Sequence, residues 1–274
     1  MSETKLSDSA LGRDVEYPDR YDSSLLFPID RAPNRETLHY AGQWIGADIW
    51  NAYEISWLNL RGRPQVAIGR FVVPADSPRL IESKSFKLYL NSFNEERYET
   101  TAEVAAIMRA DLSRIAGGPV EVHLEANLDT LELACGPFSG ECLDDLEISV
   151  DRYLPDPGLL RRASHEEVVT ETLFSNLLKS NCPVTGQPDW GSVQIGYTGP
   201  RIDRESLLKY IISFRRHTEF HEHCVERMYC DIQAAIKPES LFVMARYTRR
   251  GGLDINPWRS SAPTTVEELR NPRQ

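Results

Sequence analysis

The sequence has no long hydrophobic run and no excess of positive charge. No stretch of about 18 consecutive apolar residues occurs, which excludes a transmembrane helix of ordinary length. The first 22 residues are polar and contain no apolar signal segment, so secretion is not expected. The formal net charge of −10 disfavours broad binding to a nucleic-acid backbone but leaves room for a small basic site. We therefore expect a cytoplasmic protein with no membrane partner and no direct nucleic-acid partner.

Cysteine is scarce, and its distribution is unlike a disulfide framework. The number of cysteines is odd, and no CxxC pair occurs. This usage indicates a reducing compartment, in which a reactive thiol survives. The five cysteines are Cys135, Cys142, Cys182, Cys224 and Cys230.

Hydrophobic periodicity predicts two strands, two helices and a further strand in the first half of the chain. Thr100 and Glu103 form a capping-box pattern at the start of the second helix. No GxGxxG sequence opens a helix after a strand, so a Rossmann nucleotide site is not indicated. The predicted ranges are 53–60, 65–74, 82–93, 100–115 and 120–126.

The second half of the chain repeats this order. A shift of 121 residues, without gaps, pairs Ser85 with Ser206 and Tyr89 with Tyr210. One constant shift and one order of elements together indicate an internal duplication. We therefore predict an α+β protein built from two similar modules, each an antiparallel sheet with two helices inserted between strands.

The predicted modules have approximate boundaries. The first spans residues 36–150 and the second spans residues 165–270. Residues 1–35 form a polar arm that we expect to be loosely ordered or draped on the surface.

The stretch from Ser180 to Gly191 holds one cysteine and one acid. Its proline and glycine residues interrupt regular structure, so an ordered loop is predicted. In such a loop Cys182 could act as a nucleophile, and Asp189 could move protons. The alternative is a buried structural cysteine beside a solvated aspartate, which composition alone favours.

The two copies carry different reactive residue types. Cys182 has no cysteine counterpart in the first copy, and His221 and Glu222 stand opposite threonines. Conversely, the second copy has Asp203-Arg204-Glu205 where the first has Glu82-Ser83-Lys84. This division is hard to explain if all of these residues are structural.

Three of the six histidines lie in one short segment, at His217, His221 and His223. The spacing is not HExxH, although a zinc site formed by His217, His221 and Cys182 is one alternative. Another is a helix N-terminus with solvated histidines. Apolar neighbours at helical spacing predict that His221 points inward with Glu222 beside it. A buried carboxylate there needs donors, such as the N–H groups of a purine-like base.

Three arginines, Arg246, Arg249 and Arg250, lie close to the pair Gly251-Gly252. A solvated hairpin end and a phosphate site are about equally consistent with this pattern. The two glycines permit a close backbone approach but are a weak signal alone.

Four separate motifs resemble those of the queuosine-pathway nitrile reductases, the NADPH-dependent 7-cyano-7-deazaguanine reductases. The resemblance covers both modules and is to the long, two-module form. The fold that it implies is the tunnelling fold (T-fold), shared with GTP cyclohydrolase I. The motifs are Ile81 to Tyr89, Cys182 to Trp190, the pair His221-Glu222, and Arg249 to Gly252.

The resemblance also implies an activity. This is reduction of the nitrile of 7-cyano-7-deazaguanine (preQ0) to the aminomethyl compound (preQ1), through a covalent cysteine thioimidate, for queuosine in tRNA. NADPH is the implied cofactor, used twice, and no metal is expected. The implied partner is a small deazapurine, and we expect a homo-oligomer, with a homodimer favoured.

The resemblance assigns roles residue by residue. Cys182 matches the nucleophile and Asp189 matches its proton donor. The implied substrate contacts are Ile81, Glu82, Ser83, His221 and Glu222, and the implied cofactor contacts are Ser83, Lys84, Arg250 and Gly251.

Two other functions stay open at this point. One is a zinc-dependent, cyclohydrolase-like enzyme on the same fold, which metal analysis would separate from the reductase. The other is a purine-binding module without catalysis, which a covalent adduct at Cys182 would exclude.

Overall fold

The computed structural model describes residues 18–164 and 167–274. It is a mixed α+β structure with antiparallel sheets, as the sequence predicts. The chain divides into two compact units. Unit 1 contains the described residues up to Thr37, together with Ala47–Glu132 and Arg249–Asp254; unit 2 contains Leu38–Gly46, Leu133–Thr248 and Ile255–Gln274.

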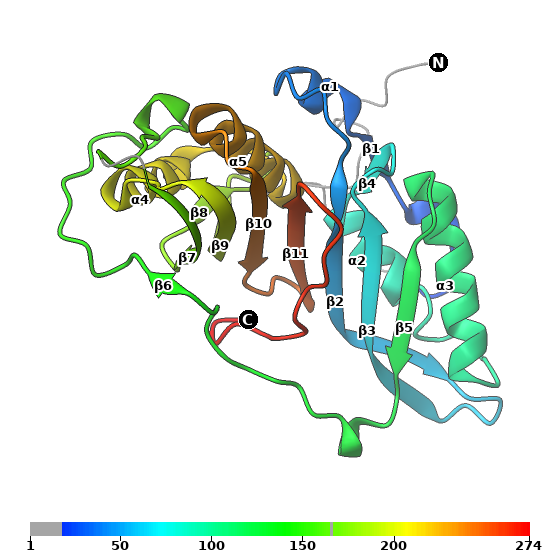
Figure 1. Ribbon diagram of the computed structural model, residues 1–274. Coiled ribbons are helices and arrows are strands. Elements are labelled where there is room, and N and C mark those ends of the chain that lie inside the picture. The colour runs from blue at the N-terminus through cyan, green and yellow to red at the C-terminus, as the bar shows by residue number, and fades with distance from the viewer. Residues whose placement is uncertain (1–17, 165–166) are drawn as a thin grey trace. The chain divides into compact units, whose positions relative to one another are not determined.

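Unit 1 is built on antiparallel strands in the order β5-β3-β2 (Figure 1). Two helices separate β3 from β5 in the chain. The bounds are β2 (Ile45–Leu58), β3 (Pro64–Pro74), β4 (Arg79–Ile81), α2 (Ser83–Asn91), α3 (Thr101–Ala116) and β5 (Glu121–Glu125). Phe86 of α2 packs edge-on against Phe71 of β3 and Trp50 of β2, which fixes the helix on the sheet.

The ends of α3 follow from the local sequence. The Thr100 side chain accepts a hydrogen bond from Glu103 N at 3.1 Å, as the capping-box pattern predicts. The Glu103 carboxylate accepts from Glu99 N rather than from Thr100 N. Gly117 ends the helix with φ of 75°, a left-handed conformation that glycine adopts without strain.

The described part of the N-terminal arm, residues 18–35, contains regular structure, so of the two expectations, loosely ordered or draped on the surface, the first is wrong there. The strand β1 (Pro28–Asp30) pairs with β4, and the helix α1 (Ala32–Glu36) follows. Arg31 between them is buried and donates to Asp48 at 2.5 Å. A buried ion pair is not apparent from the polar composition of the arm, which suggested solvation. The rest of the predicted arm lies outside the described residues.

Unit 2 repeats the order strand, strand, helix, helix, strand. Its main strands pair antiparallel in the order β11-β10-β9-β7, and the short strands β8 and β6 pair with β9 and β7. The bounds are β6 (Glu141–Cys142), β7 (Val168–Ser175), β8 (Lys179–Asn181), β9 (Pro188–Pro200), α4 (Arg204–Ser213), α5 (His221–Ile236), β10 (Ser240–Tyr247) and β11 (Leu253–Ser260). Short 3-10 turns lie at Ser23–Leu25, Leu128–Thr130, Pro157–Leu159 and Phe214–Arg216.

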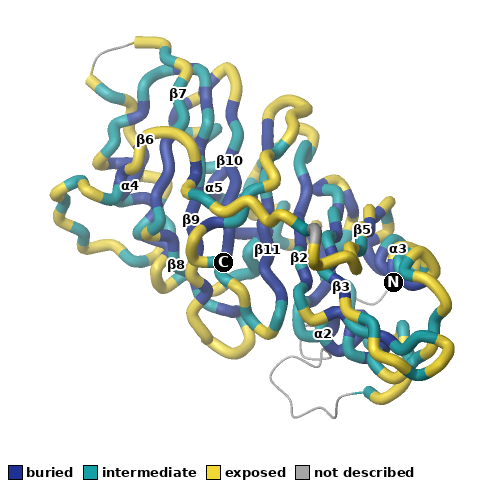
Figure 2. Tube along the Cα trace, turned by 90° about the horizontal axis from the view of Figure 1, so that it is seen from below, coloured by how far each residue is buried: buried dark blue, intermediate teal, exposed yellow. Residues whose placement is uncertain are grey.

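The core of unit 2 lies between its helices and its sheet. Figure 2 shows buried residues along β9 and β10. Apolar side chains from α4 and α5 meet alternate residues of these strands, as their periods of 3.6 and 2 require. This core includes Leu207, Ile211, Val225, Met228, Val193, Ile195, Leu241 and Val243.

The duplication extends to individual hydrogen bonds at the start of each first helix. In unit 1, Ser85 Oγ donates to Glu82 O at 2.7 Å and accepts from Phe27 N at 3.0 Å. In unit 2, Ser206 Oγ donates to Asp203 O at 2.8 Å. It also accepts from the backbone N of Arg161 at 3.2 Å. Ser85 and Ser206 therefore form equivalent hydrogen bonds in the two copies.

The paired tyrosines also match. Tyr89 donates its hydroxyl proton to Asp111 at 2.9 Å, and Tyr210 donates to Asp231 at 2.7 Å. The two aspartates are 120 residues apart, and α3 and α5 also begin and end 120 residues apart, so the prediction of one constant shift of 121 residues is wrong by one residue in the second helix.

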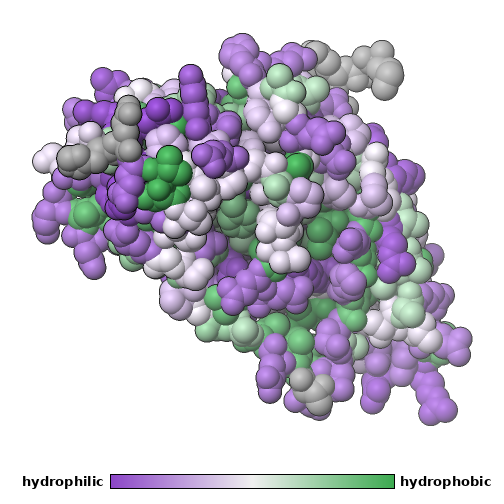
Figure 3. Space-filling view, in the orientation of Figure 1, coloured by the Kyte–Doolittle hydropathy of each residue, from purple (hydrophilic) through white to green (hydrophobic). Residues whose placement is uncertain are grey.

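The face in Figure 3 carries hydrophilic and hydrophobic residues interspersed. In the described part of the chain, no helix is long and apolar enough to cross a membrane.

Candidate active site

Cys182 and Asp189 lie on a β-hairpin, so the prediction of a loop from 180 to 191 is only partly correct. β8 and β9 pair through Asn181, which is opposite Pro188, and Ser180, which is opposite Asp189. Proline is tolerated here because Pro188 is the first residue of its strand. Beyond the strands, Cys182 N donates to Gln187 O at 2.9 Å. The proline and glycine residues of this stretch therefore interrupt regular structure only between Asn181 and Pro188.

Both side chains face the same side of the hairpin. Side chains alternate along a strand, so Ser180 and Cys182 share a face, and the opposed pair puts Asp189 there too. Cys182 is 8% exposed and Asp189 is 3% exposed. The alternative of a buried cysteine beside a solvated aspartate is therefore wrong for the aspartate, which is buried.

His221 adjoins this pair from the start of α5. Its Nε2 lies 3.3 Å from Asp189 Oδ2, and its ring stacks on Tyr247 with centroids 3.8 Å apart. The imidazole can exchange a proton with the carboxyl, because the two groups are close to hydrogen-bond distance. The predicted inward orientation of His221 is confirmed, and the neighbouring Glu222 is buried.

The other two histidines of the segment are not solvated. His217 lies before α5 begins and is partly buried, which lowers its pKa to about 4. His223 is buried, and its Nδ1 lies 3.1 Å from Glu219 Oε1. The interpretation as solvated histidines at a helix N-terminus is therefore wrong. Over residues 18–164 and 167–274, no group of three His, Cys, Asp or Glu residues is arranged to hold a metal ion.

Two further residues border this site and are not among the predicted site residues. Tyr247 is fully buried beneath His221, and Ser180 is buried opposite Asp189. Alternation along the strand gives Tyr247 the face of Val243, so the sequence identifies it only as core. Burial raises the pKa of the neighbouring Cys224 to about 12, so this thiol stays protonated.

In unit 1, Glu82 caps the N-terminus of α2. Its carboxylate accepts from Lys84 N and Ser85 N, both at 2.8 Å, and the residue is fully buried. Ser83 Oγ lies 3.5 Å from Glu82 Oε1, and Ile81 is the buried last residue of β4. The implied substrate contacts of unit 1 thus adjoin one helix end, where the backbone N–H groups point outward.

The turn between β10 and β11 lies against α2 in unit 1. Gly251 has φ of 56°, and a Cβ placed on it would lie 3.1 Å from Lys87 Nζ. Lys87 is three residues after Lys84, so the two lysines are neighbours on the helix surface. The turn therefore contacts α2 at Lys87, one helical turn after the implied cofactor contact Lys84.

The three arginines do not form one cluster. Arg246 is buried, and its guanidinium donates to the carbonyl oxygens of Glu267 and Leu269. Arg249 lies over the ring of Tyr53, with the guanidinium carbon 4.8 Å from the ring centroid. Only Arg249 and Arg250 belong to the turn, so the sequence grouping is wrong for Arg246.

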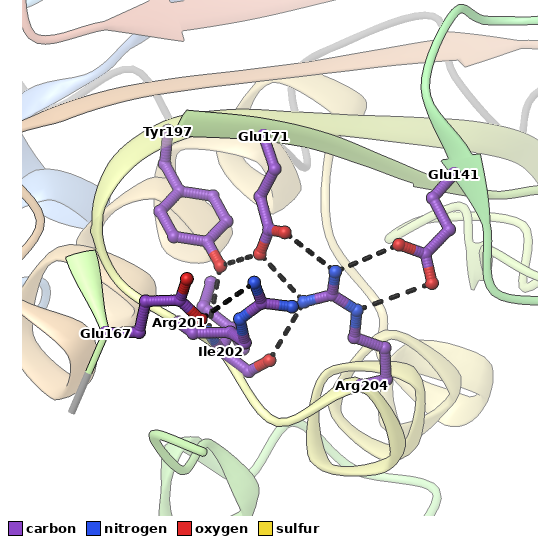
Figure 4. Close-up of polar contacts among 7 residues, drawn as sticks. All are labelled: Glu141, Glu167, Glu171, Tyr197, Arg201, Ile202 and Arg204. Atoms are coloured by element: carbon purple, nitrogen blue, oxygen red, sulfur yellow. Dashed lines mark hydrogen bonds and ion pairs between the residues drawn. The ribbon is translucent and has the colours of Figure 1, made fainter. Parts of the chain in front are cut away.

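An ion-pair network occupies the corresponding helix start in unit 2 (Figure 4). Arg204, the counterpart of Ser83, donates to both carboxylate oxygens of Glu171 at 2.7 Å. It also donates to Glu141 at 2.9 Å, and the Tyr197 hydroxyl donates to Glu171. Ser83 is implied to contact substrate and cofactor in the first copy, whereas its counterpart Arg204 forms structural ion pairs in the second.

Comparison with known proteins gives matches over most of the chain. Residues 17–124 match the family described as nitrile reductase, 7-cyano-7-deazaguanine-reductase N-term, and residues 188–265 match the family described as QueF-like protein. The chain also shows a slight likeness to a crystal structure of the archaeosine synthase QueF-Like in the apo form. That likeness has a TM-score of 0.32 at 18% identity and covers 37% of this chain and 100% of the other, too little to bear on the fold.

Curated relatives match at high identity. NADPH-dependent 7-cyano-7-deazaguanine reductases from Bordetella avium and Paraburkholderia xenovorans are each 56% identical to this chain. The first match covers 98% of this chain and 99% of the relative, and the second covers 92% and 93%. The reductase from Chromobacterium violaceum is 54% identical, over 97% of this chain and 96% of the relative. The chain therefore belongs to the family of NADPH-dependent 7-cyano-7-deazaguanine reductases.

Proposed function

We propose that this protein reduces the nitrile of 7-cyano-7-deazaguanine to the aminomethyl compound with two NADPH, for queuosine modification of tRNA. The observation that supports it best is the contact of His221 Nε2 with Asp189 Oδ2 at 3.3 Å, on the hairpin whose turn carries Cys182. Addition to a nitrile requires a nucleophile for the carbon and a proton donor for the nitrogen, which a thiol and a carboxyl supply.

The first half of the reaction uses both hairpin residues. The Cys182 thiolate adds to the nitrile carbon, and Asp189 gives a proton to the nitrogen, which forms a thioimidate. Hydride addition to its carbon gives a tetrahedral thiol adduct. The C–S bond then breaks, Cys182 leaves as the thiolate, and an imine forms. A second hydride and a second proton complete the amine, so one nitrile consumes two NADPH and two protons.

Each unit supplies proposed ligand contacts of its own. In unit 2 these are His221 and Glu222, and the Glu222 carboxylate would accept hydrogen bonds from the ring N–H and the exocyclic amine of the base. In unit 1 they are Ile81, Glu82 and Ser83. NADPH supplies the hydrides when bound. Lys84 and Arg250 would pair with its phosphates, and Gly251 permits a close backbone approach because it carries no side chain.

We also propose that each copy is a T-fold module, spanning residues 36–150 and 165–270, and that the protein is a homodimer. The repeated order of strands and helices in the two units supports the first proposal. Size-exclusion chromatography with light scattering tests the second, because a mass near 31.2 kDa for the particle would contradict it.

The test of the function is the stoichiometry of turnover. Purified protein mixed with the nitrile and NADPH is expected to oxidise two NADPH for each amine that forms, measured by absorbance and by mass spectrometry of the product. Prior dialysis against a chelator is expected to leave the rate unchanged. The proposal fails if no amine appears, and a rate that falls with stoichiometric loss of zinc would support a metal enzyme instead.

The cap made by Glu82 gives a prediction with an internal control. Glu82→Ala removes the acceptor of two backbone N–H groups, so we expect the free energy of unfolding to fall by roughly 1–2 kcal/mol in urea titrations. The variant should also bind the nitrile more weakly, because Glu82 is a proposed substrate contact.

The matched control is Asp203→Ala, since Asp203 caps α4 in unit 2 by accepting from Ser206 N at 2.8 Å. A similar loss of stability is expected, with little change in substrate affinity by calorimetry. Equal weakening of substrate binding in both variants would show that Glu82 acts only as a helix cap.

A further inference from the structure

The imidazole of His221 lies flat on the ring of Tyr247. Their centroids are 3.8 Å apart and their planes differ by 6°. The aromatic ring is fully buried in the core of unit 2, whereas the histidine side chain is 13% exposed. A fixed ring beneath a partly exposed one restricts how the imidazole can tilt and turn.

The position of Tyr247 is tied to that of Asp189 through the sheet. Tyr247 of β10 pairs with Gly191 of β9, two residues after the acid on the same strand. Residues two apart on a strand face the same side, so the ring and the carboxyl emerge on one face. The pairing of β10 with β9 therefore fixes the position of the Tyr247 ring relative to Asp189. The stacked ring in turn fixes the position of the His221 imidazole.

The Tyr247 ring packs against Gly191, which has no side chain. A Cβ placed on Gly191 would lie 3.2 Å from Tyr247 Cδ1 and 3.2 Å from the backbone oxygen of Arg246, both tighter than most Cβ contacts. Farther along the same strand, a Cβ on Gly196 would meet its neighbours at ordinary distances of 3.6 Å and more. The two glycines thus offer a change that presses on the ring and a matched change that does not.

The hydroxyl of Tyr247 does not supply a charge. Burial raises the pKa of Tyr247 well above its ordinary value, so the group stays neutral. Ser180 and Cys224 lie beside the hydroxyl, with Asp189 the nearby acid. Tyr247 therefore brings no charge to the site, and its contact with His221 is made by its ring.

We propose that Tyr247 is a positioning residue, which holds the His221 imidazole against Asp189 and so keeps the proton donor ready for each of the two reductions. The proposal rests on the proposed function for its catalytic part. The stacking contact itself, and its effect on the coupling of His221 to Asp189, are independent of any reaction.

The kinetic test compares two substitutions of the ring. Tyr247→Leu removes the stacking plane, and we expect kcat to fall about 10- to 100-fold, because small displacements at a reacting centre cost up to about 10²-fold. KM for the nitrile should rise by a smaller factor than kcat falls, because Tyr247 acts on the base only through His221, one of several proposed substrate contacts. Tyr247→Phe keeps the plane and is expected to recover most of kcat.

The glycine pair gives a second kinetic arm. Gly191→Ala is expected to lower kcat several-fold with little change in KM, whereas Gly196→Ala should match the wild type. A Tyr247→Leu variant that keeps the wild-type kcat, or a Tyr247→Phe variant that loses as much as the leucine variant, would overturn the proposal.

An NMR arm works without substrate or NADPH. In the wild type the Cε1 proton of His221 is expected to be shifted upfield by the stacked ring, and Asp189→Asn should move the resonance. In the Tyr247→Leu background both the upfield shift and the response to Asp189→Asn should disappear. If they persist, the ring does not position His221. If the wild type reduces no nitrile yet the NMR result is as expected, the proposed function fails while the positioning contact stands.

Discussion

Replacement of Cys182 by alanine is expected to lower nitrile-dependent oxidation of NADPH by roughly 10³-fold or more. The thiolate forms the covalent bond that makes the nitrile carbon a hydride acceptor, so nothing remains to replace it. Because the side chain is small and lies at a hairpin turn, the fold should survive. Steady-state kinetics, with circular dichroism as a check of folding, measure the effect.

Cys142→Ala is the matched control for this variant. Cys142 is an exposed thiol in β6, and its removal should leave turnover at the wild-type rate. Retained turnover in Cys182→Ala, with the alanine confirmed by mass, would remove Cys182 from the mechanism.

Asp189→Asn is expected to lower kcat by about 10²- to 10⁴-fold, the range ascribed to a positioned proton donor. The amide keeps the size of the side chain but cannot deliver a proton to the nitrile nitrogen. The contact with His221 Nε2 would also lose its charge. Single-turnover kinetics should show the defect in the first step, before the nitrile is reduced.

The Cys182 thiol should still react with an alkylating agent in Asp189→Asn, which distinguishes loss of the acid from loss of the nucleophile. A kcat within about threefold of the wild type would assign proton donation to another group, with His221 the nearest candidate.

Local patterns in the sequence predict much of this fold because they depend on neighbouring residues. The period of apolar residues and the cap at Thr100 give α3, and the shift of 121 residues gives the repeat, which Ser85 and Ser206 then confirm in their hydrogen bonds. The class of residue at each site position is likewise visible in the sequence.

Contacts between segments that are distant in the chain could not be predicted from the sequence. The pairing of Lys179–Asn181 with residues 188–190 turns most of an expected loop into a hairpin. The role of Tyr247 depends on His221 lying over it, 26 residues earlier in the chain, and a buried tyrosine after alternating apolar residues looks like ordinary core. The burial of Arg246 and the partial burial of His217 likewise follow from packing that no local pattern predicts.

The central claim is that Cys182 attacks the nitrile carbon, and the mass of the intact protein after incubation with the nitrile in the absence of NADPH tests it most directly. We predict a mass increase equal to one whole nitrile molecule, carried on the peptide that contains Cys182 and discharged when NADPH is added. The increase should be absent in Cys182→Ala and present in Cys142→Ala. No adduct under conditions that support turnover, or an adduct on another residue, would contradict the account.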